Sequence, residues 1–389
     1  MPIHQECHER IRRLQTQLEQ RELDGALLAY PIDVYYYAGT RQNALLWVPT
    51  NGEPLLLVRK SLSRARDESA VTDVRPFPPS REISRLLGDK ARRVGLTFDV
   101  LPIQQLHFFN KVLPGLEFLD ISAVNRELRS IKSAWELDKL KQSGMRLCEV
   151  FAQIPEVLKP GMREVDLSAE IEYRARKLGC EGYVRLRAFN QELFRGIAVA
   201  GANAAAPGFF DGPACGSGLS GASAHGASMA VIGRDAPILV DYTAVFEGYI
   251  VDMTRMFVFG SLRPELRKAF EVSLDIQEYL EENLLPGQDC AELFAGSQAM
   301  AEAGGLAAHF MGAPGEQAKF VGHGVGLELD ELPILAQGFQ VPLQLGQTLA
   351  VEPKFVFPEV GVVGIENTYA VGATGGQRLT QLADTIIAL

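Results

Sequence analysis

Two aspartates inside an apolar, strand-like segment place the strongest constraint on this fold. Residues 238–260 read ILVDYTAVFEGYIVDMTRMFVFG, and their Val, Ile, Phe and Tyr content predicts two β-strands. A turn at Glu247–Gly248 pairs these strands so that Asp252 lies opposite Thr243 and diagonal to Asp241. Because side chains alternate between faces along a strand, both aspartates point to one side. Diagonal neighbours lie roughly 7–8 Å apart or less, so the two carboxylates can converge on metal ions.

Two other interpretations of this hairpin stay open on the segment alone. A solvent-exposed strand face could carry Asp241 and Asp252 as scattered surface charges. Arg255, in the same hairpin, could also pair with one of them and satisfy its charge. The choice between these interpretations depends on what the rest of the chain brings to the aspartates.

Length and composition limit the class of protein. A chain of 389 residues exceeds one ordinary core, which predicts two domains. The net charge of −10 and the absence of a basic run argue against nucleic-acid binding. The polar N-terminus has no apolar signal-peptide core, and no later apolar run approaches the length of a membrane span, so neither is expected. Five widely spaced cysteines without a CxxC pair predict reduced thiols in a cytoplasmic protein.

Residues 1–128 predict an α/β domain. An amphipathic helix is expected over residues 1–24, and further helices over 61–69, 81–88 and 102–113. Short apolar runs predict strands at 26–30, 44–48, 54–58 and 93–98. We interpret Tyr35, Tyr36 and Tyr37 as part of a half-buried strand, with a binding surface as the alternative.

Residues 129–389 predict a second domain that contains an internal repeat. It opens at Ser133, whose S-A-W-E pattern predicts a helix with a capping box. Two helix pairs then share the pattern L-x-P-G-x5-L, with corresponding residues 126 positions apart: Leu158, Pro160, Gly161 and Leu167 against Leu284, Pro286, Gly287 and Leu293. The shared context indicates two related halves, each with a helix pair that backs strands.

A second predicted strand pair also brings two acidic side chains together. Segments 349–357 and 362–371 predict two strands, and a turn centred on Glu359 places Glu352 directly opposite Glu366. Like charges in that position are destabilising unless a cation lies between them. Pro353 cannot donate a ladder hydrogen bond, so we expect the sheet to be irregular beside Glu352.

His323 lies in the glycine-rich segment FVGHGVGLELDELP. A histidine among glycines is more often an ordinary loop residue, but here four candidate carboxylates accompany it. Those carboxylates carry −4 and two divalent cations carry +4. With one neutral imidazole the set suits Mn²⁺, Co²⁺, Fe²⁺ or Zn²⁺. Two such ions about 3.5–4 Å apart can lower the pKa of a shared water molecule.

The order of these motifs resembles a known family. D-x10-D followed by T-R, then G-H-G-x-G-L, E-P and I-E-x-T, is similar to the pita-bread metallohydrolases, which include methionine aminopeptidase, Xaa-Pro aminopeptidase, prolidase and creatinase. The resemblance covers essentially the whole chain. It implies an α/β creatinase-like N-terminal domain and an α+β pita-bread catalytic domain with an internal pseudo-twofold repeat.

The resemblance also implies roles for individual residues around two divalent metal ions. Asp241 would chelate one metal ion, Asp252 and Glu366 would bridge the two, and His323 and Glu352 would bind the other. Glu352 would also shuttle protons, and His225, in SAHGAS, would steady the scissile carbonyl or its oxyanion. The implied activity is cleavage of a peptide bond near the N-terminus of small peptides, as in Xaa-Pro aminopeptidases or dipeptidases, by a homodimer.

Three positions depart from the family pattern. Asp330 stands where members commonly have a second histidine, and Gly364 stands where prolidase-like members have an arginine. Thr243 replaces a usual glycine. Since the first two positions help to bind substrate in the relatives, Asp330 is a candidate substrate-binding residue. A turn- or helix-capping role is the alternative for Asp330.

These departures leave two other functions open. One is the same fold acting on a non-peptide small molecule, by amide or amidine hydrolysis or by elimination. The other is a non-catalytic binding module, although such proteins usually lose ligands and all five are present here. In each case the expected partner is a small peptide or small molecule, with no nucleic acid and no membrane.

Overall fold

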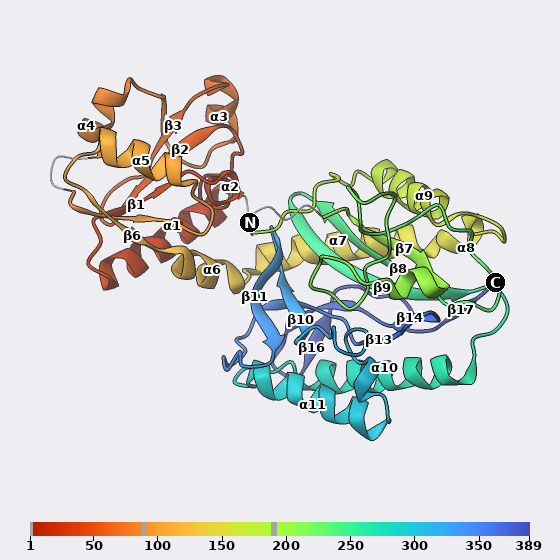
Figure 1. The fold of residues 1–389 in the computed structure, drawn as a ribbon. Coiled ribbons are helices and arrows are strands. Elements are labelled where there is room, and N and C mark those ends of the chain that lie inside the picture. The colour runs from red at the N-terminus through yellow and green to blue at the C-terminus, as the bar shows by residue number, and fades with distance from the viewer. Residues whose placement is uncertain (1–2, 88–90, 188–192) are drawn as a thin grey trace. The chain divides into compact units, whose positions relative to one another are not determined.

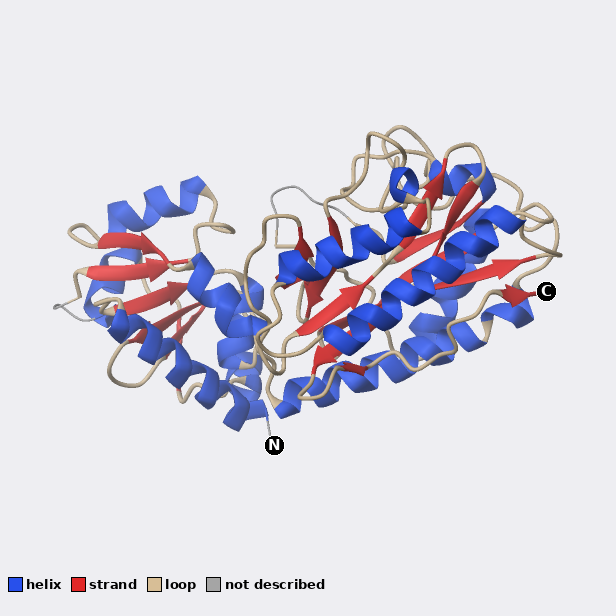
Figure 2. Cartoon of the chain, turned by 90° about the horizontal axis from the view of Figure 1, so that it is seen from below, coloured by secondary structure: helices blue, strands red, loops and turns tan. Residues whose placement is uncertain are grey.

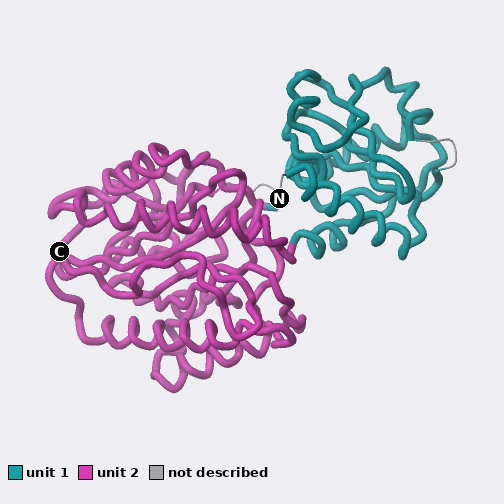
Figure 3. The backbone as a smooth tube through the Cα atoms, turned by 180° about the vertical axis from the view of Figure 1, so that it is seen from behind, with its two compact units in different colours: residues 1–129, 187–190 teal, residues 130–186, 191–389 magenta. Residues whose placement is uncertain are grey.

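The computed structural model describes residues 3–87, 91–187 and 193–389. The chain divides into two compact units, residues 1–129 with 187–190 and residues 130–186 with 191–389, coloured teal and magenta in Figure 3. Each unit has its own hydrophobic core. Among the described residues, no helix combines the length and the apolar content that a membrane crossing requires.

The first unit is an α/β domain around a six-stranded sheet of order β4-β3-β2-β1-β5-β6 (Figure 1). Its elements are α1 (Ile3–Gln20), β1 (Gly25–Leu28), α2 (Pro31–Ala38), β2 (Ala44–Pro49), β3 (Leu55–Val58), α3 (Leu62–Glu68), β4 (Asp73–Pro76), α4 (Ile83–Leu87), β5 (Arg93–Leu96), α5 (Ile103–Val112), β6 (Glu117–Asp120) and α6 (Ser122–Ser130). The four strands expected from apolar runs are present. Strands β4 and β6 were not predicted, because Asp73–Pro76 and Glu117–Asp120 each expose half of their residues and lack an apolar run.

The strand predicted at Tyr35–Tyr37 is wrong, because these residues form helix α2. Pro31 stands in the first turn, where its missing N–H costs nothing. Gly39 ends the helix at a φ of 76°, the left-handed conformation that glycine adopts readily. Tyr36 and Tyr37 are buried within the unit, and the Tyr37 hydroxyl donates to the Asn125 side chain at 3.0 Å.

The second unit opens with the predicted capped helix. Helix α7 (Ala134–Ala152) begins after Ser133, whose hydroxyl accepts from the Glu136 N–H at 3.2 Å. The Glu136 carboxylate in turn accepts from the Ser133 N–H at 3.1 Å, which completes the capping box. The short helix α8 (Ile154–Val157) follows α7 and has Pro155 in its first turn.

The two predicted helix pairs are present at matching positions. Helix α9 spans Glu164–Lys177 and α11 spans Cys290–Ala303, so their ends correspond residue for residue at the spacing of the repeat. Gly161 and Gly287, which precede them, both have left-handed backbones, with φ of 83° and 92°. Helix α10 (Pro264–Asn283) is the counterpart of α7 and α8.

The strands of the second unit form two principal sheets and one short ladder. One sheet has the order β17-β9-β8-β7 and the other the order β11-β10-β12-β15-β16, while β13 and β14 form a two-stranded ladder. Their bounds are β7 (Gly196–Ala200), β8 (Ile238–Phe246), β9 (Tyr249–Val258), β10 (Phe320–Val325), β11 (Leu329–Ala336), β12 (Thr348–Val351), β13 (Lys354–Phe357), β14 (Gly361–Gly364), β15 (Asn367–Val371), β16 (Gly376–Arg378) and β17 (Ile387–Ala388). A bridge between Thr254 and Glu366 joins the two sheets. Helix α7 packs against β8 and β9, and α10 packs against β13 and β14. Figure 2 shows long helices lying alongside the strands.

Gly144 brings the capped helix α7 close to the C-terminal segment. A Cβ at this position would overlap the backbone carbonyl of Leu379. Gly296, in α11, is a matched case in which a Cβ would meet the hydroxyl end of the Tyr279 side chain instead. A side-chain end can rotate away, whereas the carbonyl of a paired segment cannot.

We therefore expect Gly144→Ala to destabilise the protein, although alanine favours an isolated helix by about 1 kcal/mol over glycine. Overpacking a closed contact costs about 1–3 kcal/mol, so the net free energy of unfolding should fall. Gly296→Ala should leave that free energy unchanged or raise it. Chemical denaturation of both variants measures the difference, and equal stability of the two would contradict the close approach at Leu379.

Candidate metal centre

The aspartate hairpin has the predicted register. In the β8–β9 ladder Phe246 pairs with Tyr249, and Asp252 pairs with Thr243. The turn residues Glu247 and Gly248 both have positive φ, 50° and 85°, as a tight hairpin turn requires. Asp241 and Asp252 therefore face the same side and line one cavity.

The second carboxylate pair lies where two ladders meet. The β12–β15 ladder ends at the pair Val351–Asn367, and the β13–β14 ladder begins at the pair Lys354–Gly364. Glu352 and Glu366 lie between these ladders, and the irregularity falls at Pro353 as expected. Both glutamates are buried, 6% and 1% exposed, so their charges need compensation within the protein.

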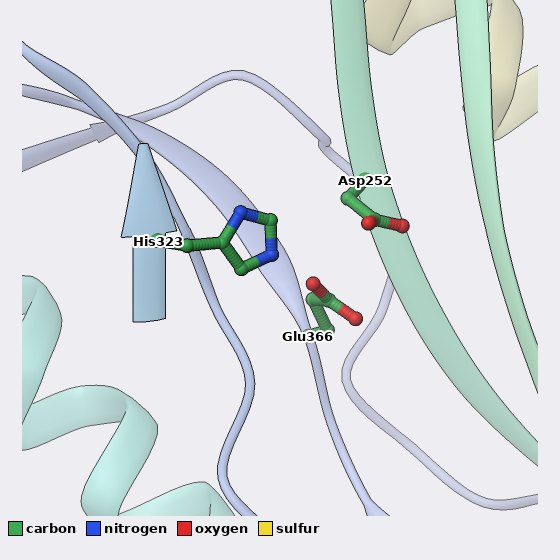
Figure 4. A group of neighbouring side chains, drawn as sticks. All are labelled: Asp252, His323 and Glu366. Atoms are coloured by element: carbon green, nitrogen blue, oxygen red, sulfur yellow. The ribbon is translucent and has the colours of Figure 1, made fainter. Parts of the chain in front are cut away.

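Asp252 on β9, His323 on β10 and Glu366 between β14 and β15 point toward one another (Figure 4). Each offers one ligand atom, and these atoms all lie within 4.8 Å of one another. We call these three residues the histidine group. All three are buried, and a neutral imidazole with two carboxylates is a donor set that suits a borderline divalent ion. The side chains therefore fit one metal ion.

Asp241, Glu352 and Glu366 form a second set whose ligand atoms also lie within 4.8 Å of one another. We call these three residues the carboxylate group. The five predicted ligands thus line one cavity, but the carboxylate group already contacts a cation. The Nζ of Lys354 lies 2.9 Å from Asp241, 2.6 Å from Glu352 and 2.9 Å from Glu366.

Lys354 is a residue of this site that the sequence analysis did not single out. It follows Glu352 by two positions, and alternation along a strand places such residues on one face. That spacing could have placed Lys354 beside Glu352 in the site. Burial lowers the pKa of Lys354, but the three carboxylates outweigh burial and hold that pKa well above its ordinary value. Lys354 is therefore a charged ammonium within the site.

Even with this ammonium, the site carries an excess of negative charge. Burial raises the pKa of Asp252 well above its ordinary value, and the carboxylates of Glu366 and Asp241 raise it further. Burial also raises the pKa of Glu366 to about 7, against the opposing effect of Lys354. These shifts indicate that the histidine group needs a further cation to stay fully ionised at neutral pH.

Asp330 lies in the same cavity, where it contacts the predicted histidine ligand. Its Oδ1 is 3.3 Å from Nδ1 of His323, and its side chain is 42% exposed. Burial lowers the pKa of His323, but Asp330 and Glu352 outweigh burial and raise it. The contact of Asp330 is with an imidazole and not with a helix end, which disfavours the capping role. Its predicted role in substrate binding stays a prediction.

Arg255 does not pair with either aspartate of the hairpin. It donates instead to the backbone carbonyl of Glu366 at 2.9 Å and to the Asn367 side chain at 2.9 Å, and it forms an ion pair with Asp384 at 3.0 Å. The interpretation in which Arg255 neutralises Asp241 or Asp252 is therefore wrong.

His225 lines the cavity near the first aspartate. Its Nδ1 lies 3.1 Å from the Cys215 sulfur, and the ring of Phe210 packs 5.6 Å away, between centroids. Burial lowers the pKa of His225, although Asp241 opposes this effect. The imidazole is therefore neutral at pH 7 and can donate one N–H without carrying charge.

Glu164 holds the segment that carries His225, and the sequence analysis missed this role. The buried carboxylate, at the start of α9, accepts from the Ala200 N–H at 2.7 Å and the Asn203 side chain at 2.6 Å. It also accepts from the backbone N–H and the hydroxyl of Ser228, at 2.9 and 2.7 Å. These bonds tie both ends of the irregular segment to one fixed anion.

Comparisons with known proteins agree with this geometry. Residues 138–373 match the model of metallopeptidase family M24, and residues 10–131 match that of the creatinase/prolidase N-terminal domain. The Xaa-Pro dipeptidases of Pyrococcus furiosus and Pyrococcus horikoshii are 27% and 26% identical to the chain, over 96% and 98% of its length and 98% and 99% of theirs. The crystal structure of the prolidase from Pyrococcus horikoshii OT3 has the same fold, with a TM-score of 0.82 at 24% identity, over 97% of this chain and 100% of the other.

The contact between Asp330 and His323 predicts a measurable effect on metal affinity. A carboxylate that orients a ligand imidazole typically contributes about 10–100-fold to metal affinity, so Asp330→Asn should weaken binding by that factor at high pH. Only neutral His323 binds metal, so affinity falls as pH drops through the raised pKa of His323. The uncharged amide of the variant would no longer raise that pKa. The difference in metal affinity between the variant and the wild type should therefore become smaller as pH falls.

Metal titrations at several pH values measure this effect. Asp211→Asn is the matched control, because Asp211 is exposed and lines the same cavity away from the imidazole. A difference in metal affinity that stays constant over the whole pH range would contradict an electrostatic link between Asp330 and His323.

Proposed function

The chain belongs to metallopeptidase family M24, and from that membership we propose that it is a divalent-metal-dependent peptidase acting on Xaa-Pro dipeptides or on other short peptides near their N-termini. The observation that carries the proposal is the meeting of Asp241, Asp252, His323, Glu352 and Glu366 in one cavity. Relatives of matching length that are called Xaa-Pro dipeptidases support the substrate class.

The shape of the cavity supports a short peptide as substrate. It has a volume of about 260 Å³, and its walls include the apolar side chains of Phe210, Phe320 and Ile334 beside the acidic residues. An apolar wall beside a few placed polar groups can hold the ring of a proline and orient its peptide bond.

The chain's own residues supply the acid–base and electrostatic parts of hydrolysis. A bound divalent ion would polarise the substrate carbonyl and lower the pKa of the attacking water. Glu352, whose Oε1 lies 4.0 Å from Nε2 of His323, is placed to take a proton from that water and pass it to the leaving amine. Neutral His225 can donate an N–H to the oxyanion that develops on the carbonyl.

Several predictions from the sequence belong to this proposal without a test of their own. They are the choice among Mn²⁺, Co²⁺, Fe²⁺ and Zn²⁺, the division into domains at residues 1–128 and 129–389, the homodimer and the cytoplasmic location. The second of the two predicted ions is not part of this proposal, because Lys354 already contacts the carboxylate group. The absence of a nucleic-acid or membrane partner also stays a prediction.

Action on a non-peptide small molecule is less well supported. That alternative was motivated by Asp330 and Gly364 in place of substrate-binding residues, yet Asp330 contacts His323 and Gly364 pairs with Lys354. Relatives called dipeptidases favour peptide hydrolysis. A non-catalytic binding module is disfavoured by family membership and by the full set of candidate ligands.

Removal of metal should abolish hydrolysis. We expect the chelated protein to be inactive on a panel of Xaa-Pro dipeptides, and to regain activity when a divalent ion is restored. Activity that survives complete chelation, or no hydrolysis of any peptide by the metal-loaded protein, would contradict the proposal.

Glu352→Gln should lower kcat by about 10²–10⁴-fold, the usual contribution of a general acid–base group. Glu359→Gln, at the exposed turn between β13 and β14, is the matched control and should leave kcat unchanged. Steady-state kinetics on one dipeptide compares the two. A Glu352→Gln variant with near wild-type kcat would remove Glu352 from the proton-transfer role.

His225→Ala should lower kcat by about 10²–10³-fold, as expected for loss of an oxyanion donor. Its metal content should not change, because His225 is in neither group of candidate ligands. Kinetics and metal analysis of the same preparation separate the two effects, and loss of metal would instead assign His225 to the metal site.

A further inference from the structure

The ammonium of Lys354 is fully coordinated. A lysine ammonium has three N–H donors, and here three carboxylates, Asp241, Glu352 and Glu366, each lie within 2.6–2.9 Å of it. The side chain is 1% exposed, so water does not share this role. The carboxylate group is therefore occupied by a cation that belongs to the chain.

This ammonium contacts only one of the two sets of candidate ligands. Its three partners are the members of the carboxylate group, whereas Asp252 and His323 make no hydrogen bond with it among the described residues. Glu366 belongs to both groups. Its Oε2 accepts from Lys354 and from Thr254 at 2.8 Å, and its Oε1 takes part in neither bond. Each residue of the histidine group therefore still has an atom that can bind a metal ion.

The strand opposite Lys354 is shaped for the lysine stem. Lys354 pairs with Gly364 in the β13–β14 ladder. A Cβ at Gly364 would approach the Lys354 Cγ and the Pro353 carbonyl to 2.6 Å each. Any larger residue at position 364 would therefore overlap both the stem and the backbone of Pro353 and Lys354. A conformer that withdrew the ammonium from the carboxylates would leave a charge buried without a partner, which is costly.

A metal ion in the carboxylate group would compete directly with this ammonium. Metal–oxygen bonds of about 2.0–2.2 Å require the ion to lie among the same three carboxylates that surround Nζ. The two cations would then repel each other at close range in a buried site. The carboxylate group therefore does not fit a metal ion while Lys354 is in place, whereas the histidine group does.

We propose that Lys354 supplies, as a fixed ammonium, the positive charge predicted for a second metal ion, so that the protein binds one divalent ion, at Asp252, His323 and Glu366. The proposal rests on the metal-dependent function proposed above for the existence of that one ion. In this centre Asp241 and Glu352 are partners of a lysine, and the fixed charge of Lys354 remains after chelation.

The direct test is the metal content of the full-length protein, loaded with Mn²⁺ and freed of excess. We expect one ion per chain and the electron paramagnetic resonance spectrum of isolated Mn²⁺. Two ions per chain with a spin-coupled spectrum would overturn the proposal and leave the metal-dependent function standing. A protein that holds no ion would instead overturn the proposed function.

Substitutions in the two groups sharpen the test. Asp241→Asn should retain one ion with an affinity close to that of wild type, because Asp241 is not a ligand in this centre. Asp252→Asn should lose the ion. If Asp241→Asn lowered the content from two ions to one, the carboxylate group would be a metal site and the proposal would fail.

Replacing the ammonium should open the second position. Lys354→Met removes the charge at nearly constant length, and we expect Mn²⁺ content to rise from one ion to two. Lys319→Met, the same change at an exposed position before β10, is the matched control and should keep one ion. A folded Lys354→Met protein that still held one ion would contradict the proposal. If this variant does not fold, the Mn²⁺ contents of the wild-type and Asp241→Asn proteins show whether one ion or two are bound.

Discussion

The mutual repulsion of three buried carboxylates and a fourth that is partly buried is the constraint on which the rest of the catalytic unit depends. Asp252, Glu352 and Glu366 are each less than 10% exposed, and Asp241 joins them from the same hairpin as Asp252. Four such groups cannot all stay ionised in a low dielectric unless cations lie among them. The raised pKa values of Asp252 and Glu366 express this constraint. A stable fold therefore requires both strands that hold the carboxylates rigidly and positive charge that balances them.

The strands meet the first requirement through register. Hairpin β8–β9 sets Asp241 and Asp252 on one face, and the break between two ladders sets Glu352 against Glu366. The Thr254 hydroxyl, on β9, donates to Glu366 at 2.8 Å, so the two carboxylate pairs are tied to each other directly. Helices α7 and α10 then cover the outer faces of these strands, which keeps the register fixed.

What the sequence could predict follows from how local each feature is. The positive-φ turn at Glu247–Gly248 and the turn at Glu359 set strand register within a few residues, so both carboxylate pairs were predictable. Proline and glycine at the ends of α2 are also local signals, and they favour a helix. Three consecutive tyrosines favour a strand instead, but β propensity depends strongly on context. Lys354 was missed for a different reason. Its partner Asp241 is distant in the sequence, and only the assembled sheets bring the ammonium among the carboxylates.

The two departures from the family pattern, Asp330 and Gly364, both affect the part of the site that binds cations. Asp330 and Gly364 were identified as losses from the substrate-binding surface, yet each acts on the cation-binding interior. Asp330 contacts His323, a candidate metal ligand, and Gly364 leaves the space that the Lys354 stem occupies. A glycine without a lysine opposite would leave the carboxylate group without this ammonium, and a larger residue at position 364 would meet both the Lys354 Cγ and the Pro353 carbonyl. Under the proposal of one metal ion, Gly364 and Lys354 act together, because the side chain of Lys354 takes the place of a bound cation and Gly364 leaves room for its stem.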